Sequence, residues 1–229
     1  MRARLVESCE IGPDVRHFLF DVPEVDQLEF IPGQFVSFSE AVFGREVTRA
    51  YSVCSAPGGN RFELCLNRVR EGLFSPWLFE MAPGRTVEMS GPLGFFVPRQ
   101  PFRDSVLIAT GTGIAPFRAF LRWAPVVESG KRITLLFGAR YPRGLVYSGE
   151  FETLAKERPE FRFLPTVTRP DADYRGRIGW VQQHLDDALD GRLDVDVYIC
   201  GLREMVDSVR AILKEKGFER SQIHYERYD

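Results

Sequence analysis

Hydrophobic and polar side chains follow one pattern up to about residue 97 and another beyond residue 101. In the first part, short runs such as residues 16–21 and 34–39 alternate apolar with polar side chains, and turn signals rich in Pro and Gly separate them. This alternation is typical of strands that bury one face, and many short strands favour an antiparallel barrel or sandwich. We predict further strands at 61–69 and 86–90, and a helix at about 75–81 with Ser75 as its cap.

Beyond residues 97–101, where two prolines flank a polar pair, apolar strand-like runs alternate with helix-like stretches. Strands are predicted at 105–109, 133–139, 161–168, 194–201 and 223–228, and helices at 117–123, 150–158, 179–189 and 204–217. This order predicts an α/β fold with a doubly wound parallel sheet, in which ligands bind beyond the carboxyl ends of the strands. We therefore predict two domains, an antiparallel β-barrel at residues 1–100 and an α/β domain at 101–229.

Composition excludes several classes of protein. Of the 229 residues, 44% are hydrophobic and 27% are charged, and the net charge of −2 gives no reason to expect a nucleic-acid partner. No apolar run reaches the ~18 residues of a membrane span, and the N-terminal residues lack the apolar core of a signal peptide. Four widely spaced cysteines and three distant histidines lead us to expect no metal site and a reducing, cytoplasmic location.

A glycine turn at residues 111–118 (Gly-Thr-Gly-Ile-Ala-Pro-Phe-Arg) stands between a predicted strand and a predicted helix. Gly111 and Gly113 allow a phosphate to approach the backbone, and the helix start offers unpaired N–H groups to an anion. Pro116 suits the first helical turn. Taken alone, the turn is as compatible with an ordinary strand–helix connection as with a phosphate site.

Two clusters in the first part carry further candidate chemistry. In a strand, Arg49 and Tyr51 of residues 49–52 (Arg-Ala-Tyr-Ser) share one face and Ser52 points to the other. Such a set could hold a phosphate, stack on a ring and bond to a ring nitrogen. Residues 72–75 (Gly-Leu-Phe-Ser) form a second glycine turn that enters a helix. Each cluster alone is more commonly an ordinary strand or a plain capped helix.

Together with Gly-Pro-Leu-Gly-Phe-Phe at residues 91–96 and Cys-Gly before a Met-bearing helix at 200–205, these motifs resemble the ferredoxin–NADP reductase family over nearly the whole chain. The resemblance implies an FAD-binding barrel followed by a nicotinamide-nucleotide domain, with no iron–sulfur domain. The FAD-binding residues that it implies are Arg49, Ala50, Tyr51, Ser52, Cys65, Leu66, Asn67, Val69, Gly72, Leu73, Phe74, Ser75 and Tyr228. The NAD(P)-binding residues that we expect are Gly111, Thr112, Gly113, Ile114, Ala115, Pro116, Thr168, Arg169, Cys200 and Gly201, with Arg140 and Arg177 as further candidates because a 2′-phosphate needs a basic pocket beyond the strand ends.

The resemblance also assigns roles to these residues. Arg49 would pair with the FAD pyrophosphate and Tyr51 would stack on the isoalloxazine. The implied catalytic residues are Ser52 near flavin N5, Cys200 beside nicotinamide C4, Glu226 and Tyr228. The sequence Glu-x-Tyr at residues 226–228 resembles the ending of some relatives, in which the tyrosine covers the flavin. Here Asp229 follows, so Tyr228 either stacks on the flavin, is redirected, or belongs to a frayed tail.

The implied function is that of an FAD-dependent oxidoreductase, which transfers hydride between NADP(H) and flavin N5 and electrons to a separate ferredoxin- or flavodoxin-type acceptor. The pair at residues 168–169 (Thr-Arg) resembles one that grips the 2′-phosphate, and it favours NADP(H), although NADH-using relatives can carry the arginine. Tyr141 and Tyr147 are candidates for stacking on adenine. Three alternatives stay open: an NADH-dependent reductase component of an oxygenase, a flavin-binding electron-relay subunit of a larger complex, and a nucleotide-binding sensor.

Overall fold

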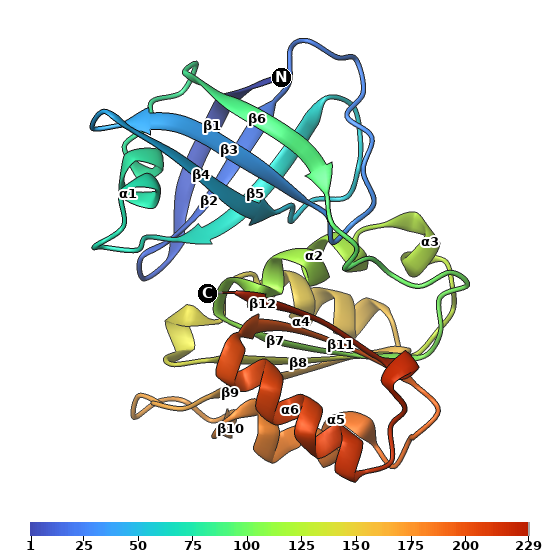
Figure 1. The fold of residues 1–229 in the computed structure, drawn as a ribbon. Helices are drawn as coiled ribbons and strands as arrows, with labels where there is room; N and C mark the ends of the chain where they lie inside the picture. The colour runs from blue at the N-terminus through green and yellow to red at the C-terminus, as the bar shows by residue number, and fades with distance from the viewer. Residues whose placement is uncertain (229) are drawn as a thin grey trace. The chain divides into compact units, whose positions relative to one another are not determined.

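The computed structural model describes residues 1–228, which form two compact units (Figure 1). The first unit comprises Met1–Pro98 and Ala115–Trp123, and the second comprises Arg99–Ile114 and residues 124–228. Asp229, and with it the question of whether that residue redirects Tyr228, lies outside the described residues.

The first unit is built on an antiparallel sheet in the order β4-β3-β6-β1-β2-β5 (Figure 1). Its strands are β1 (Arg2–Gly12), β2 (Val15–Asp21), β3 (Phe35–Val42), β4 (Arg45–Ser52), β5 (Arg61–Asn67) and β6 (Thr86–Leu93). Val53, directly after β4, forms an isolated antiparallel bridge with Leu64 of β5. The bridge joins the two outer strands of the sheet and closes it into the predicted barrel.

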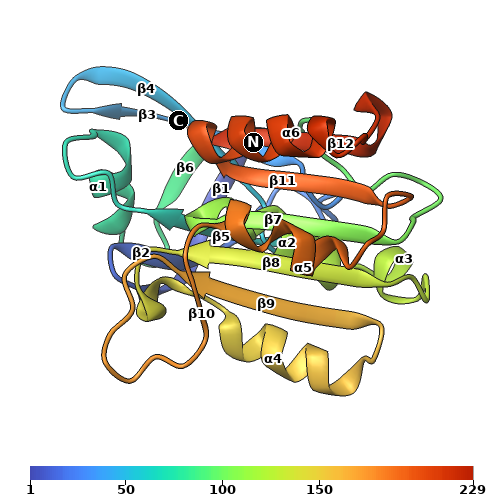
Figure 2. The same ribbon diagram turned by 90° about the horizontal axis from the view of Figure 1, so that it is seen from below.

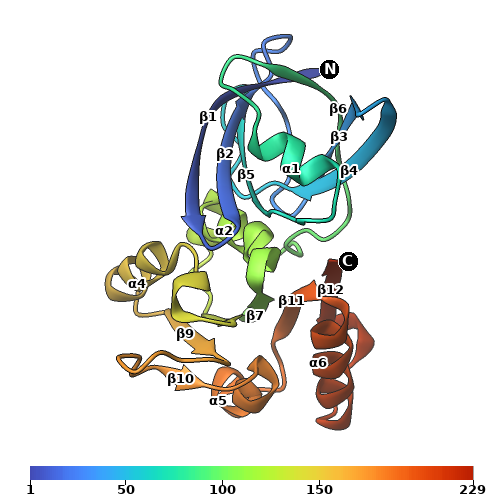
Figure 3. The ribbon, with the colours of Figure 1, turned by 90° about the vertical axis from the view of Figure 1, so that its left-hand side faces the viewer.

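Alternating aromatic side chains fill this barrel. Phe18 and Phe20 of β2 are fully buried, and the Phe20 ring packs on Phe38 and Phe62 with centroids 5.0 and 5.6 Å apart. Helix α1 (Phe74–Phe79) lies at one end of the barrel (Figure 3), where Phe74 and two further apolar side chains join the core. Each buried aromatic side chain contributes about 1.5–3 kcal/mol to stability.

The predicted capping role of Ser75 is wrong. Helix α1 begins at Phe74, and its N-cap residue is Leu73, which makes no side-chain cap bond. The Ser75 hydroxyl instead accepts a hydrogen bond from the backbone N–H of Val69 at 2.9 Å. Because the helix starts one residue earlier than expected, Ser75 lies inside its first turn and its side chain holds the preceding loop.

Helix α2 (Ala115–Leu121) completes the first unit. Phe117 and Phe120 of α2 pack on Phe96 with ring centroids 5.9 and 6.0 Å apart. All seven residues of α2 are buried. The unit is therefore assembled from two stretches of chain that are separated in sequence.

The second unit contains a parallel sheet in the order β10-β9-β8-β7-β11-β12 (Figure 2). Its strands are β7 (Ser105–Thr110), β8 (Ile133–Ala139), β9 (Phe161–Val167), β10 (Arg177–Ile178), β11 (Asp196–Leu202) and β12 (Ile223–Tyr228). The chain adds strands to one side of β7 up to β10 and then crosses to add β11 on the other side. This reversal between β7 and β11 is the switch point where doubly wound sheets bind ligands, and the predicted fold class is confirmed.

Helices cover both faces of this sheet. α5 (Leu185–Leu189) and α6 (Arg203–Glu215) share one hydrophobic core with one sheet face, whereas Phe151 of α4 (Ser148–Glu157) packs on Phe163 on the other. The remaining short elements are α3 (Ala124–Val127) and the 3₁₀ turns η1 (Gly111–Ile114), η2 (Pro142–Gly144), η3 (Val181–His184) and η4 (Arg220–Gln222). No helix within residues 1–228 has the length and apolar character needed to cross a bilayer.

The helix predicted at 179–189 is only partly present. Gly179 has a φ of +126° and its N–H donates to Val167 O at 2.8 Å, so the chain there continues from the short strand β10. The helical part begins at Val181 as η3 and becomes α5 at Leu185. A backbone in the left-handed half of φ space cannot start a right-handed helix.

Candidate functional site

Strand β4 presents the first predicted cluster. The Arg49 side chain is exposed, and its Nη1 donates to the carbonyl of Thr48 at 2.8 Å. Within residues 1–228, no carboxylate forms an ion pair with Arg49. An exposed guanidinium with no carboxylate partner among these residues is available to an anion from outside, which fits the predicted role toward a pyrophosphate.

Tyr51, on the same strand, is held by aromatic neighbours. Its ring packs on Phe38 and Phe74 with centroids 6.0 and 6.1 Å away. Burial raises the pKa of Tyr51, and the nearby Arg49 charge partly opposes this. Ser52, the last residue of β4, is buried. The strand thus separates the exposed Arg49 from the buried Ser52, as its period of two requires.

The loop from β5 to α1 is closed by its own hydrogen bonds. Gly72 N donates to Val69 O at 2.9 Å, and Val69 N donates to the Ser75 hydroxyl at 2.9 Å. The N–H of Gly72, in the predicted glycine turn at residues 72–75, and the N–H of Val69 before it are therefore used internally, while the first N–H groups of a helix have no intrahelical acceptors. Of the neighbouring predicted residues, Cys65 and Leu66 are buried, and Asn67 and Val69 are exposed.

In the second unit, the glycine turn follows β7. Gly111 has a φ of +56°, which glycine adopts without strain. A Cβ on Gly113 would lie 2.3 Å from the carbonyl oxygen of Cys200. A Cβ on Gly201, which has a φ of +149°, would lie 2.3 Å from Thr110 Oγ1. At the switch point of the sheet, Gly113 therefore lies directly against the backbone of β11, and Gly201 lies directly against the Thr110 side chain at the end of β7.

Cys200 lies at this meeting point and is fully buried. Burial raises the pKa of its thiol well above the usual value, the Glu226 carboxylate raises it further, and a hydrogen bond with Tyr228 opposes the shift. Strand pairing places Glu226 opposite Cys200 and Tyr228 opposite Leu202. Three of the four predicted catalytic residues thus lie on two neighbouring strands of the second unit, and Ser52 belongs to the first unit.

Arginine residues follow β8 and β9, at the carboxyl ends of these two strands. Thr168 N donates to Ala139 O at 3.1 Å, and Arg169 N donates to Arg140 O at 2.8 Å, so the segments after β8 and β9 run side by side. The Arg169 guanidinium donates to the Tyr141 hydroxyl at 3.5 Å and lowers the pKa of Tyr141.

Arg177 differs from these arginines. Its Nε and Nη2 donate to one carboxylate oxygen of Asp187 at 2.9 and 2.7 Å. Arg177 is therefore compensated by an internal partner, whereas Arg140 and Arg169 are exposed at the strand ends.

Thr110 is a candidate that the sequence reasoning missed. Its hydroxyl oxygen is buried and has no hydrogen-bond partner among the described residues. A buried hydroxyl without a partner is costly, so its position next to the glycine turn points to a ligand or a water. The one signal in the sequence is a polar residue at the end of an otherwise apolar strand.

These features fit an anionic, ring-bearing ligand in each unit. In the first, Arg49 supplies an uncompensated charge and Tyr51 a fixed ring. In the second, Gly113 and Gly201 form a backbone cradle that a Cβ would fill, beside the unpartnered hydroxyl of Thr110.

Comparisons with known proteins agree with this arrangement. Two family models match the chain, the oxidoreductase FAD-binding domain over residues 2–97 and the oxidoreductase NAD-binding domain over residues 107–211. Ferredoxin--NADP reductase B of Sorangium cellulosum (strain So ce56) is 37% identical over 99% of this chain and 97% of its own length.

Two further relatives differ in how much of their own length this chain spans. The toluate 1,2-dioxygenase electron transfer component of Pseudomonas putida is 32% identical over 89% of this chain, which spans only 60% of that protein. A crystal structure of a ferredoxin NADP+ reductase from Neisseria gonorrhoeae with bound FAD and NADP is 25% identical. It aligns with a TM-score of 0.85 over 99% of this chain and 98% of its own.

The two domain matches make the chain an oxidoreductase that binds FAD and a nicotinamide nucleotide, as predicted. Since a relative of nearly equal length is 37% identical over almost the whole chain, this protein belongs to the ferredoxin–NADP reductase family.

Proposed function

We propose that this protein is an FAD-dependent reductase that exchanges electrons between NADP(H) and a separate ferredoxin- or flavodoxin-type protein. The observation that carries the proposal is the end-to-end match to a ferredoxin–NADP reductase of nearly the same length. When bound, FAD and the nicotinamide nucleotide supply the hydride and single-electron chemistry, and the protein supplies binding and orientation. We also place the boundary between the two domains near residue 100, and infer a cytoplasmic location from four free cysteines.

In the first unit, the proposed work is to hold the flavin. Arg49 binds the pyrophosphate through its exposed guanidinium, and Tyr51 offers the face of a ring that two aromatic neighbours hold in place. The buried Ser52 hydroxyl is the proposed neighbour of flavin N5.

In the second unit, the backbone of residues 111–116 accepts the nucleotide phosphates. Cys200 contributes a small neutral side chain next to the nicotinamide, because its raised pKa keeps the thiol protonated at neutral pH. We assign Glu226 to tuning the local charge and Tyr228 to covering the flavin ring. No acid or base of unusual strength is required for this chemistry.

The proposed preference for NADP(H) rests on the positive charge at the carboxyl ends of β8 and β9. Arg140 and Arg169 are exposed there, and the Arg169 guanidinium already reaches a hydroxyl, that of Tyr141. A 2′-phosphate carries negative charge that such arginines bind by charge-assisted hydrogen bonds. Of the two candidates for stacking on adenine, Tyr141 and Tyr147, we favour Tyr141, because its side chain is 40% exposed.

A second candidate function is that of the reductase component of an oxygenase, with NADH as the donor. The toluate 1,2-dioxygenase electron transfer component, 32% identical, favours this reading. In both readings electrons pass to a separate acceptor. The readings differ in the nucleotide and in the acceptor.

One experiment tests both candidates. The purified protein is examined by visible spectroscopy and then titrated anaerobically with NADPH and, separately, with NADH. We expect flavin absorption that bleaches with NADPH at a lower concentration than with NADH. A preference for NADH would support the oxygenase reading. A colourless protein that takes up no FAD would contradict both and revive the sensor reading.

A further inference from the structure

Arg118, the last residue of the glycine-turn motif, lies inside the first unit rather than at the nucleotide turn. Residues 111–114 of the motif belong to the second unit, whereas Arg118 is part of α2 and is only 5% exposed. Its Nη1 donates to the carbonyl of Cys54 at 3.0 Å and to the carboxylate of Glu63. The charged end of Arg118 is thus engaged within the barrel unit.

Glu63 ties the segment that follows Ser52 to strand β5. The backbone N–H of Cys54 donates to Glu63 O at 2.8 Å, and the N–H of Glu63 donates to the Ser55 hydroxyl at 3.1 Å. Arg118 adds a bond from the other side to the Cys54 carbonyl. Residues 53–55 are therefore held by β5 and by α2 together.

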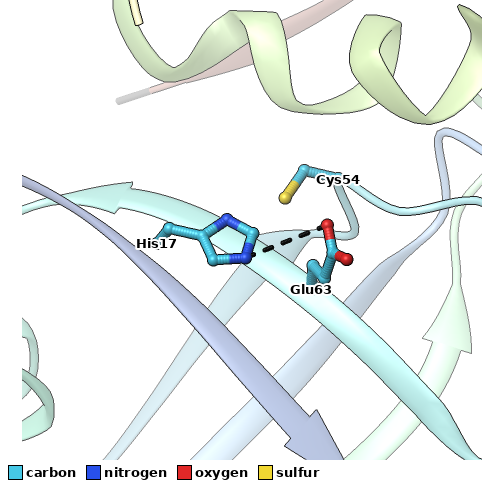
Figure 4. A group of neighbouring side chains, drawn as sticks. All are labelled: His17, Cys54 and Glu63. Atoms are coloured by element: carbon cyan, nitrogen blue, oxygen red, sulfur yellow. Dashed lines mark ion pairs between the residues drawn. The ribbon is translucent and has the colours of Figure 1, made fainter. Parts of the chain in front are cut away.

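Figure 4 shows His17, Cys54 and Glu63 turned toward one another from β2, the segment after β4, and β5. Their potential ligand atoms lie within 4.8 Å of each other, which is a spacing that a metal ion could use. The Arg118 guanidinium, however, bonds to the same carboxylate and lies 3.9 Å from Cys54 Sγ. A metal ion would have to share this small space with a fixed positive charge. The buried cation of this cluster is Arg118, and the more exposed Arg122 reaches the same carboxylate at 3.5 Å.

From these contacts we infer that Arg118 is a positioning residue for the flavin and not a ligand of the nucleotide. With Glu63, it fixes the segment that begins directly after Ser52, and so it sets where Tyr51 and Ser52 lie. The inference rests on the proposed function, in which these two residues contact FAD. Arg118 is the buried partner of this pair, and its removal leaves the Glu63 carboxylate, among the described residues, with only the longer contacts to Arg122 and His17, at 3.5 and 3.9 Å.

The test uses Arg118→Gln, with Arg118→Lys as the conservative variant and Arg122→Gln as the matched control. Arg122 lies one turn further along the chain and reaches Glu63 at 3.5 Å, but it is 47% exposed. Four quantities are measured: the Kd of FAD after removal and return of the flavin, the flavin midpoint potential, the Kd of NADP+, and the melting temperature.

We expect Arg118→Gln to weaken FAD binding about tenfold and to shift the potential, as losing a charged hydrogen bond would. Arg118→Lys should recover most of the affinity, because a single nitrogen makes both bonds in the wild type and an ammonium offers enough donors. Arg122→Gln should stay within about twofold of the wild type, as exposed pairs contribute little. The Kd of NADP+ should be unchanged throughout.

Two results would overturn the inference. A weakened NADP+ affinity with unchanged FAD affinity would make Arg118 a nucleotide residue. A lowered melting temperature with unchanged FAD affinity and potential would make the pair merely structural. If Arg118→Gln does not fold, the same four measurements on Glu63→Gln test the inference, since that substitution removes the negative charge of the other partner. A wild-type protein that binds no FAD would instead contradict the proposed function and this inference together.

Discussion

The two candidate binding regions differ in the groups that form them: side chains in the first unit and closely approached glycine backbone in the second. In the barrel unit, the cluster at residues 49–52 consists of side chains, with an exposed guanidinium, a ring between aromatic neighbours and a buried hydroxyl. In the second unit, the site depends on close approach of the glycine backbone, with no space for a Cβ at Gly113, against Cys200 O, or at Gly201, against Thr110 Oγ1.

The difference has an energetic consequence. A site formed by side chains can lose one group and keep the others, so a substitution there lowers ligand affinity only by the contribution of the group that is removed. A backbone site works only while two chain segments stay in contact, and an added carbon must push them apart. We therefore expect graded losses in the first unit and all-or-none losses in the second.

The largest effect is expected for Gly113→Ala. Because the new methyl would lie 2.3 Å from Cys200 O, the turn must move, which we expect to cost about 1–3 kcal/mol of stability and to abolish NADP+ binding. Calorimetric titration with NADP+ and thermal melting measure both. Gly149→Ala is the control, since a Cβ there meets nothing within 4 Å. Normal NADP+ binding by Gly113→Ala would remove the contrast between the two regions.

Arg49→Ala should weaken FAD binding by about 10- to 100-fold, the worth of a charged hydrogen bond or two. Its melting temperature without FAD should not change, because Arg49 is exposed and, among residues 1–228, its side chain bonds only to the Thr48 carbonyl. Fluorescence titration of the flavin-free protein gives the Kd. Arg45→Ala, an exposed arginine of the same strand, serves as the control. An equal loss in both variants would mean that general charge, and not Arg49, holds the flavin.

Arg169→Ala should reduce the preference for NADPH over NADH about tenfold, by removing one charged contact to the 2′-phosphate. The ratio of kcat/KM for the two nucleotides is the measurement. Arg175→Ala is the control, because its guanidinium is exposed and bonds to backbone carbonyls of its own loop. An unchanged ratio would withdraw the support that Arg169 gives to NADP(H).

The smallest expected effect is the absence of labelling at Cys200. Burial raises the pKa of this thiol, so at pH 8 it stays protonated and should not react with iodoacetamide, whereas the exposed Cys9 should react. The folded state also holds this proton more tightly than the unfolded state, so stability should fall as pH rises above about 9. Mass spectrometry of the alkylated protein locates the label. Rapid labelling of Cys200 would show that the meeting point of β7 and β11 opens readily.

The fold class followed from patterns that are local in the sequence. The apolar run at Ile133–Ala139 is a strand buried on both faces, and the alternation in β2 is a barrel strand. The family motifs led to the cofactor types for the same reason, since each is a short contiguous stretch.

The remaining features depend on partners distant in the chain. Spacing gives no sign that Arg118 bonds to Glu63, 55 positions earlier, or that Asp187 pairs with Arg177. Ser75 is a good helix cap by composition, yet its hydroxyl is taken by Val69 N. In each case a polar group has several acceptable local arrangements, and tertiary packing decides between them.

Because the first unit is formed by two separate stretches of the chain, it cannot be isolated by a single truncation. A gene fragment that stops near residue 100 would encode every barrel strand but not α2. The fragment would expose Phe96, on which Phe117 and Phe120 pack, and would remove Arg118 from Glu63. Exchanging flavin modules between reductases would therefore require carrying residues 115–123 along with the barrel, as a graft of two pieces.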